Sequence, residues 1–372
     1  NSFYKFTDKN LISEKDLLLR LKKILDDNSL DKFTSHQIDI LSKVKNDLYG
    51  NNNIKNKFTL SPNVMKEIQT LNDDDIPRYL VHRYRYEIFP NKNIIDDFPP
   101  FLQIEPTSIC NYRCVFCYQT DNFFNKRSNG FMGHMTLDTF KKIIDQAEGN
   151  IEFISIASRG EPLMCPEIDK MLEYTVGKFL NLKINTNASV LNEEKSHAIL
   201  KSGIKTVVFS ADAADDELYS QLRVNGKLSK VLSNIEKFKN IKDKQYPKSK
   251  IITRVSGVKV NENQKLNDME NFWGDLVDQV AFVNYIPWEN VYNSSKKSIS
   301  QPCSDLWRRM FVWWDGKVNP CDVDYKSVLS TGNISKENLS DLWISKNYEE
   351  LRKNHLNNLR QSINPCSKCS VV

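Results

Sequence analysis

The chain has 372 residues, and its 52 Lys and Arg residues against 47 Asp and Glu residues leave a formal net charge of +5. The mean hydropathy is −0.52, and apolar runs stay far below the roughly 18 residues that a membrane span needs, so we expect a soluble protein of two or three domains. Acidic residues are interspersed among the lysines, which argues against a nucleic-acid partner.

Residues 1–97 are predicted to form a helical N-terminal extension. Asn1–Asn10 lacks the basic and apolar segments of a secretory signal, which favours a cytoplasmic location. We find no convergent reactive side chains in this extension, so we expect a structural cap or a docking surface. The expected elements are helices at Leu17–Leu25 behind a capping box at Ser13–Asp16, at Ser35–Leu48 and at Pro62–Leu71, with an Asn-rich loop at Asn51–Asn53.

Short β-branched runs alternate with amphipathic segments between residues 98 and 292. This alternation predicts a parallel sheet, either an open wound sheet or a partial barrel, with ligands beyond the carboxyl ends of the strands. The predicted strands are Phe101–Glu105, Ile151–Ile156, Leu182–Thr186, Thr206–Ser210, Ile251–Val258 and Val280–Asn284. The predicted helices are Leu137–Ala147, Glu167–Lys178, Glu193–Lys201, Asp215–Leu222, Leu228–Asn240 and Gln264–Leu276.

Seven of the eight cysteines fall into two groups, which in a reducing cytosol indicates metal binding or redox chemistry. The first cysteine group, Cys110, Cys114 and Cys117, has the spacing CxxxCxxC directly after the first predicted strand. Three thiolates on one loop can hold three irons of a 4Fe–4S cluster and leave the fourth iron open. The alternatives are a zinc site, which needs a fourth ligand, and a redox-active disulfide.

This loop and the turns that follow later strands resemble the radical S-adenosylmethionine (radical SAM) enzymes. The resemblance implies a partial (β/α)6 barrel whose open iron binds SAM and cleaves it to a 5′-deoxyadenosyl radical. It also implies an external electron donor such as flavodoxin or ferredoxin. Phe116, just before the last cysteine, corresponds to an aromatic residue that lies along the adenine in this family.

Ser158-Arg159-Gly160-Glu161-Pro162 resembles the Gly-Gly-Glu-Pro turn of the family, with Arg159 in place of the first glycine. Gly160 permits close approach of the backbone, and the Glu161 carboxylate can accept hydrogen bonds from the SAM ammonium group. Without its place after the second strand, this short motif would indicate only an ordinary turn. The resemblance makes Gly160, Glu161 and Pro162 part of the cofactor site.

The ends of the third and fourth strands carry polar residues where the family binds the ribose and the methionine carboxylate of SAM. Asn187 follows the third strand, and Ser210 and Asp212 follow the fourth. Such residues are also common turn formers. Arg223 matches an arginine that frequently follows the next helix in the family, although a surface salt bridge is the alternative for it.

Two further residues are candidate catalytic groups. Arg254 lies on the fifth strand and points into the same mouth if Thr253 and Val255 face away. Cys165 is the ungrouped cysteine, four residues after Glu161. It is either a buried structural residue or a hydrogen-atom donor at the mouth. The five histidines are scattered and indicate no metal site.

The polar segment Asn293–Gln301 is predicted to link the barrel to a small module at 302–372 that holds the second cysteine group. Asp315-Gly316 predicts a hairpin turn between Met310–Trp314 and Lys317–Asn319. Four cysteine thiolates can complete the tetrahedral coordination of a zinc ion, so a zinc ribbon is one interpretation. The spacing also resembles a short SPASM or twitch extension, which implies one fully ligated auxiliary 4Fe–4S cluster. The four cysteines of this group are Cys303, Cys321, Cys366 and Cys369.

The resemblance implies radical chemistry but leaves the reaction open. The leading hypothesis is a dehydrogenase that oxidises a sugar or aminocyclitol alcohol, with the auxiliary cluster as electron acceptor. The alternatives are an epimerase that uses Cys165 as hydrogen donor, a peptide-modifying enzyme, and a non-enzymatic zinc and iron–sulfur scaffold. We identify no peptide-leader-binding domain in Asn1–Asp97, which favours a small-molecule or carbohydrate substrate.

Overall fold

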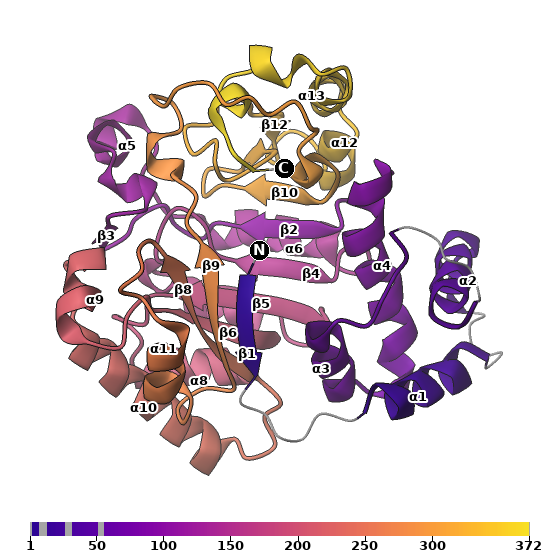
Figure 1. Cartoon of the computed structure of the whole chain (residues 1–372), viewed down its shortest axis with the longest axis horizontal. Helices are drawn as coiled ribbons and strands as arrows, with labels where there is room; N and C mark the ends of the chain where they lie inside the picture. The colour runs from indigo at the N-terminus through magenta and orange to yellow at the C-terminus, as the bar shows by residue number, and fades with distance from the viewer. Residues whose placement is uncertain (1, 7–12, 27–31, 51–55, 372) are drawn as a thin grey trace.

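The computed structural model describes residues 2–6, 13–26, 32–50 and 56–371. One large sheet runs through the molecule in the order β1-β9-β8-β6-β5-β4-β2-β10-β11-β12 (Figure 1). Six consecutive parallel strands form its centre: β2 (Phe101–Ile104), β4 (Phe153–Ile156), β5 (Asn181–Thr186), β6 (Ile204–Ser210), β8 (Ile252–Lys259) and β9 (Gln279–Asn284).

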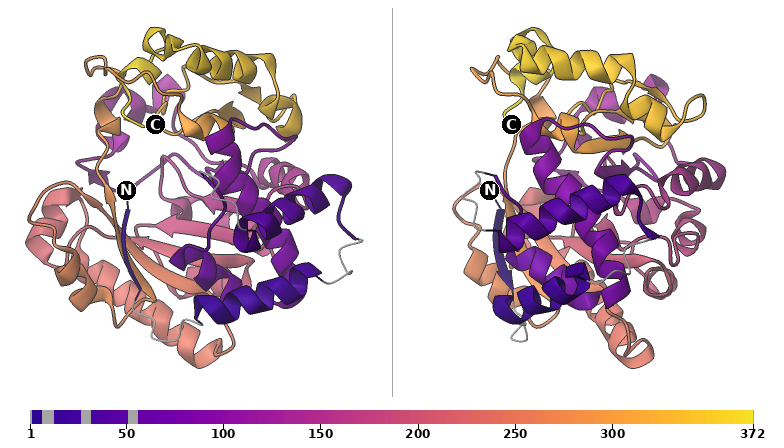
Figure 2. Two further views of the ribbon diagram at one scale, coloured as in Figure 1. Left: turned by 45° about the vertical axis from the view of Figure 1, so that its right-hand side comes forward. Right: turned by 90° about the vertical axis from the view of Figure 1, so that its right-hand side faces the viewer.

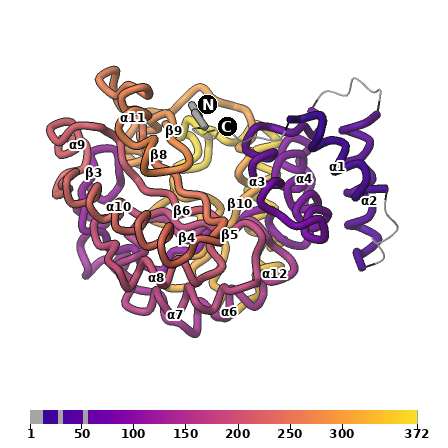
Figure 3. Tube along the Cα trace, turned by 90° about the horizontal axis from the view of Figure 1, so that it is seen from below, coloured from indigo at the N-terminus to yellow at the C-terminus, as the bar shows by residue number. Residues whose placement is uncertain are grey.

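These six strands follow one another in space in the same order as in the sequence. A doubly wound sheet would reverse direction at a switch point, so the unbroken order gives a partial barrel. Figure 3 shows helices along the outside of this curved sheet. The connecting helices are α6 (Leu137–Ala147), α7 (Ile168–Glu173), α8 (Glu193–Lys201), α9 (Asp216–Leu222), α10 (Leu228–Gln245) and α11 (Leu266–Trp273).

Side chains alternate along the barrel strands between an apolar outer face and an inner face on which polar side chains stand beside apolar ones such as Phe101 and Val208. On β5, Leu182 and Ile184 belong to the main hydrophobic core, whereas Lys183 and Asn185 face a cavity. Successive residues of a strand point to opposite faces of the sheet. The apolar side chains therefore pack against the outer helices, and the polar side chains face the barrel interior. The barrel interior is therefore equipped to bind a polar ligand.

The N-terminal extension packs against the amino ends of the barrel strands (Figures 1 and 2). Its hydrophobic core includes Phe101 and Phe153, the first residues of β2 and β4. Ser13 caps the first helix as expected, since its Oγ accepts the Asp16 N–H. The helices of the extension are α1 (Glu14–Asp26), α2 (Ser35–Tyr49), α3 (Pro62–Thr70) and α4 (Ile76–Lys92).

The extension also contributes a strand, which corrects the expectation of purely helical structure. β1 (Ser2–Phe6) pairs antiparallel with β9 and caps that edge of the sheet. The local sequence does not identify the partner strand of β1, because β1 and β9 are separated in the sequence by almost the whole barrel. The predicted loop at Asn51–Asn53 lies outside the described residues.

The segment after the barrel continues the same sheet. β10 (Arg309–Val312) pairs in parallel with β2, and β11 (Lys317–Asn319) and β12 (Gly332–Asn333) follow antiparallel. The predicted hairpin is present: the Gly316 N–H donates to the Trp313 carbonyl, and Gly316 has a positive φ of 78°. The helices α12 (Leu339–Trp343) and α13 (Lys346–Leu356) complete this region.

In the part of the chain that is described, no helix has both the length and the apolar character to cross a membrane.

Candidate active site

A cavity of about 450 Å³ opens at the carboxyl ends of the barrel strands and extends into the barrel. The structure brings most of the predicted site residues together around it, although they come from segments spread over more than a hundred residues. The predicted residues that line it are Cys110, Cys114, Phe116, Cys117, Gly160, Glu161, Asn187, Ser210 and Arg223.

The first cysteine group is held by a small second sheet. Cys114 lies in β3 (Arg113–Cys114), which pairs antiparallel with β7 (Arg223–Val224), so Cys114 is opposite Arg223. The Arg223 guanidinium donates from Nη1 to Cys114 Sγ at 3.9 Å and lies 5.7 Å from the ring centroid of Phe116. A buried ion pair of 2.5 Å to Asp212 fixes the guanidinium. Arg223 thus faces the cavity and is not a surface salt bridge.

Gly160 lets the turn approach the cysteine loop. A Cβ atom at this position would lie 2.3 Å from the Thr107 carbonyl oxygen and 2.7 Å from that of Ile109, distances that no side chain tolerates. The Glu161 N–H donates to the Ile109 carbonyl. The glycine therefore sets the position of the neighbouring carboxylate.

Glu161 is buried and its carboxylate is already oriented by protein donors. It accepts the Thr186 hydroxyl at 2.6 Å and the Asn187 N–H at 2.6 Å. Burial raises the pKa of Glu161 above its usual value, and the hydrogen bonds and Arg223 oppose that shift. A cation in the cavity would stabilise the charged form, which suits the ammonium group expected there.

Asn187 links the end of β5 to the cysteine loop. Its Nδ2 donates to Asn111 Oδ1 at 3.0 Å and lies 3.9 Å from Cys110 Sγ, while its Oδ1 accepts the Ser189 hydroxyl at 2.6 Å. Ser210, at the end of β6, lines the same cavity from the next strand. Both residues are therefore at the carboxyl edge where a ligand would contact them.

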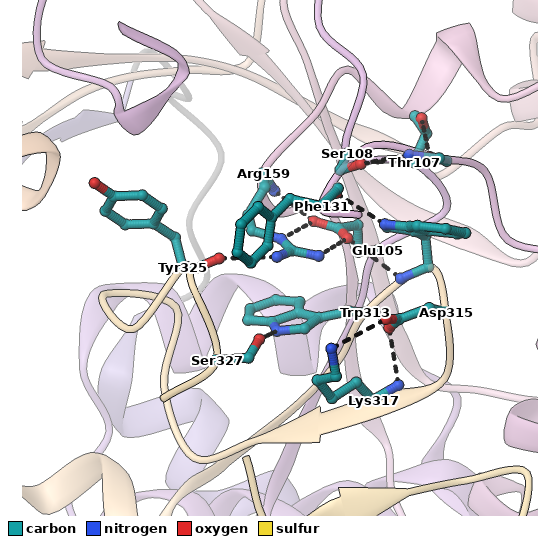
Figure 4. Close-up of polar contacts among 12 residues, drawn as sticks. Glu105, Thr107, Ser108, Phe131, Arg159, Trp313, Asp315, Lys317, Tyr325 and Ser327 are labelled. Carbon is teal, nitrogen blue, oxygen red and sulfur yellow. Dashed lines mark hydrogen bonds and ion pairs between the residues drawn. The ribbon is translucent and has the colours of Figure 1, made fainter. Parts of the chain in front are cut away.

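Arg159 replaces the first glycine of the family turn. It borders the cavity, but its guanidinium group is engaged by other groups of the protein. Its guanidinium forms a bidentate buried ion pair with Glu105 at 2.5 and 2.7 Å and donates to the Tyr325 carbonyl at 2.9 Å (Figure 4). It also lies 4.2 Å from the ring centroid of Trp313. Because Glu105 accepts the Trp314 N–H as well, this pair joins the barrel to the C-terminal region.

Four predicted site residues are not at the cavity surface. Cys165 is 2% exposed inside the main hydrophobic core, and Arg254, which donates to the Gln279 side chain, is not part of the cavity lining. Of the two alternatives for Cys165, the structure therefore gives the buried residue. Val255 faces the main hydrophobic core as the expectation for Arg254 required, but Arg254 is not among the residues that line the cavity. Asp212 and Pro162 are buried behind the lining and act through Arg223 and the turn.

The second cysteine group encloses a much smaller space of about 30 Å³. Arg360 holds the C-terminal loop by donating to the carbonyls of Cys366, Cys369 and Val371. His355, for which the sequence indicated no metal role, borders this space, and its Nδ1 accepts the Cys303 N–H. All four cysteines of the group border the space.

One aromatic cluster contacts both cysteine groups. Tyr118, Phe124 and Tyr325 pack together, with ring centroids of Tyr118 and Tyr325 only 4.9 Å apart. Cys117 of the first group and Cys321 of the second both pack against this cluster. The two cysteine groups are thus connected by continuous packed side chains.

The donor sets fit iron–sulfur clusters, because cysteine thiolates are the usual protein ligands of such clusters. Burial raises the pKa of the Cys110 thiol to about 12, so the thiolate needs a bound cation to replace its lost hydration. Three thiols around an open cavity and four around a closed one match an open and a fully ligated cluster.

Sequence reasoning missed the polar residues on the inner face of the barrel, of which Lys183 is the most notable. It stands between Leu182 and Ile184, two buried apolar residues of β5. A charged residue in the middle of a buried strand is an available signal, because such a residue needs a solvent-filled or ligand-filled space.

Comparisons with known proteins agree with this geometry. The family model described as the radical SAM superfamily matches residues 104–261, and the SPASM model, described as an iron–sulfur cluster-binding domain, matches residues 303–370. Residues 104–261 are thus a radical SAM domain, and residues 303–370 are a SPASM domain. This radical SAM protein therefore uses SAM and a 4Fe–4S cluster, with an auxiliary cluster in the SPASM domain.

The curated relatives are distant. GTP 3′,8-cyclase from Clostridium botulinum strain Okra is 27% identical over 216 residues, which cover 55% of this chain and 64% of that protein. The tungsten-containing aldehyde ferredoxin oxidoreductase cofactor-modifying protein from Pyrococcus furiosus is 24% identical over 72% of this chain and 87% of its own length.

Solved structures show the same fold. BtrN in complex with AdoMet and 2-DOIA has a TM-score of 0.50 and 18% identity, covering 75% of this chain and 95% of BtrN. Streptococcus suis SuiB bound to the precursor peptide SuiA has a TM-score of 0.53 and 16% identity, covering 94% of this chain and 89% of SuiB.

Proposed function

We propose that this radical SAM protein oxidises a secondary alcohol of a sugar or aminocyclitol. When bound, the SAM-binding cluster supplies a 5′-deoxyadenosyl radical that takes the carbinol hydrogen, and the auxiliary cluster accepts the electron left on the substrate. The hydroxyl proton leaves to water or a basic group, which completes the two-electron oxidation. An electron donor of the flavodoxin or ferredoxin class starts each cycle.

The proposed residue roles follow from the cavity. Cys110, Cys114 and Cys117 ligate the cluster, and Glu161 accepts hydrogen bonds from the SAM ammonium group. Phe116 lies along the adenine, with Asn187 and Ser210 at the polar part of SAM. Arg223, fixed by Asp212, places its positive charge beside Cys114 and the cavity.

The observation that carries the proposal is the aromatic cluster between the two cysteine groups. Tyr118 follows Cys117 directly, and it stacks on Tyr325, four residues after Cys321. A fully ligated cluster has no iron free for substrate, so its use there would be electron transfer. Packed contact between the two sites supports a reaction in which the substrate electron leaves through the auxiliary cluster.

The polar interior supports a small hydroxylated substrate, and BtrN has a structure with both AdoMet and 2-DOIA on a similar fold. The position of Cys165 does not support the epimerase alternative, because this proposed hydrogen donor lies in the hydrophobic core and does not line the cavity. Peptide modification remains the second candidate. SuiB bound to SuiA covers 94% of this chain, more than BtrN covers.

The test incubates the reconstituted wild type and Cys165→Ala in deuterium oxide and measures the mass of the products. The candidate substrates are myo-inositol, 2-DOIA, glucose and glucose 6-phosphate. We expect a product lighter by two hydrogen atoms, formed equally by both proteins. Substrate-dependent SAM cleavage that yields unoxidised product with deuterium on carbon would contradict the dehydrogenase. Oxidation that requires the thiol would contradict the placement of Cys165.

A further inference from the structure

A row of polar side chains crosses the floor of the barrel cavity. Gln103 on β2 is in register with Ser155 on β4, and Ser155 is in register with Lys183 on β5. All three line the cavity. Lys183 precedes Asn187 by four residues, so the row lies about 13 Å along the strand from the SAM end.

The side chains of this row have unused hydrogen-bonding capacity. Within the part of the chain that the structure describes, no hydrogen bond engages the Gln103 amide, the Ser155 hydroxyl or the Lys183 ammonium group. One position further up, Asn185 Oδ1 is buried without a partner. The three side chains of the row line the cavity and are therefore free to contact a ligand that enters it.

The charge around the row is positive. Lys183 Nζ lies 5.5 Å from the ring centroid of Phe101, and the Arg309 guanidinium lies 5.2 Å from the same centroid. Burial, together with Arg309 and Arg254, lowers the pKa of Lys183 to about 8. Burial would raise the pKa of the nearby Tyr86, but Arg309, Arg308 and Lys183 outweigh it and lower that pKa.

Carboxylates near the row are directed at other cations. Asp305 lies 3.3 Å from Arg309, and Asp322, which also lines the cavity, acts on the same arginine. Glu67 accepts the Tyr79 hydroxyl and lies 3.7 Å from Arg83. None of these carboxylates forms an ion pair with Lys183 among the described residues.

We infer that Lys183, with Gln103 and Ser155, binds an oxyanion of the substrate, either a phosphate ester or a carboxylate. The ammonium group supplies the charge, and the amide and hydroxyl donate further hydrogen bonds. An anion bound there would orient the substrate along the barrel strands, with its remaining carbons toward SAM. This inference rests on the proposed function for the alcohol but specifies the other end of the substrate.

Equilibrium binding to the reconstituted enzyme, loaded with SAM and kept without reductant, tests the site without turnover. We expect glucose 6-phosphate or glucuronate to bind more tightly than neutral glucose, and inorganic phosphate to compete with the tighter of the two. Lys183→Met should weaken that binding at least about tenfold, and Lys183→Arg should restore most of it. Glucose 6-phosphate and glucuronate together distinguish a phosphate ester from a carboxylate.

Lys205→Met is the matched control, because Lys205 is an exposed lysine on the neighbouring strand β6. It should bind the anions like the wild type, and SAM affinity and iron content should stay unchanged in every variant. Equal binding of anionic and neutral probes by the wild type, or an unchanged anion affinity in Lys183→Met, would overturn the inference. Loss of iron in Lys183→Met would leave Lys183→Arg and the wild-type comparison to decide. Failure of alcohol oxidation with intact anion binding would contradict only the proposed function.

Discussion

The first cysteine group borders a cavity of about 450 Å³, whereas the second surrounds a space of about 30 Å³. The first is presented on a loop between two strand ends, with Glu161 and Arg223 facing the same space. The second is closed by the C-terminal loop that Arg360 ties down. Similar thiols thus serve different purposes, because the surrounding backbone decides whether a ligand can approach.

Removal of the first cysteine group should have the largest effect. Changing Cys110, Cys114 and Cys117 together to Ala should abolish 5′-deoxyadenosine formation and leave about four irons per chain, held by the second group. Iron analysis and product chromatography measure both. Cys165→Ala, which removes a core thiol, is the control and should keep both clusters. About eight irons in the triple variant would contradict the assignment.

The next prediction concerns the buried ion pair that joins the barrel to the C-terminal region. Glu105→Gln removes one charge of the buried pair with Arg159 and leaves the other uncompensated, so the free energy of unfolding should fall by about 3–5 kcal/mol. Asp73→Asn breaks the exposed pair with Arg20 and should cost at most about 1 kcal/mol. Anaerobic urea denaturation compares the two. Equal losses would mean that the buried pair does not hold the regions together.

The smallest expected effect concerns the open site alone. Glu161→Gln should weaken SAM binding about tenfold while both clusters stay bound. Since burial raises the pKa of Glu161, part of the carboxyl is protonated at mildly acidic pH, and wild-type SAM affinity should rise with pH until the group is fully ionised. Equilibrium dialysis of labelled SAM between about pH 5 and pH 8 should show this rise in wild type and not in Glu161→Gln. A parallel rise in the variant would assign the dependence to another group.

The local patterns predicted the barrel strands well. The Leu182–Thr186 run became β5 at Asn181–Thr186, and the helices at Leu137–Ala147 and Glu193–Lys201 have the predicted bounds. Such elements follow from alternation and capping within a few residues. Pairings between distant segments were beyond these patterns. β1 joins β9, and β10 joins β2, because those edges have free hydrogen-bonding groups that any extended segment could satisfy.

The sequence by itself identified the two cysteine groups and their ligand spacing, because residue type and spacing along a loop are local properties. It also indicated the polar turn at Gly160 and Glu161. Only the tertiary structure decided that Cys165 is buried in the core, that Arg159 joins two regions, and that Lys183 faces a shared cavity. The direction of a side chain depends on strand register and on the elements packed behind it, and both arise from contacts between distant parts of the chain.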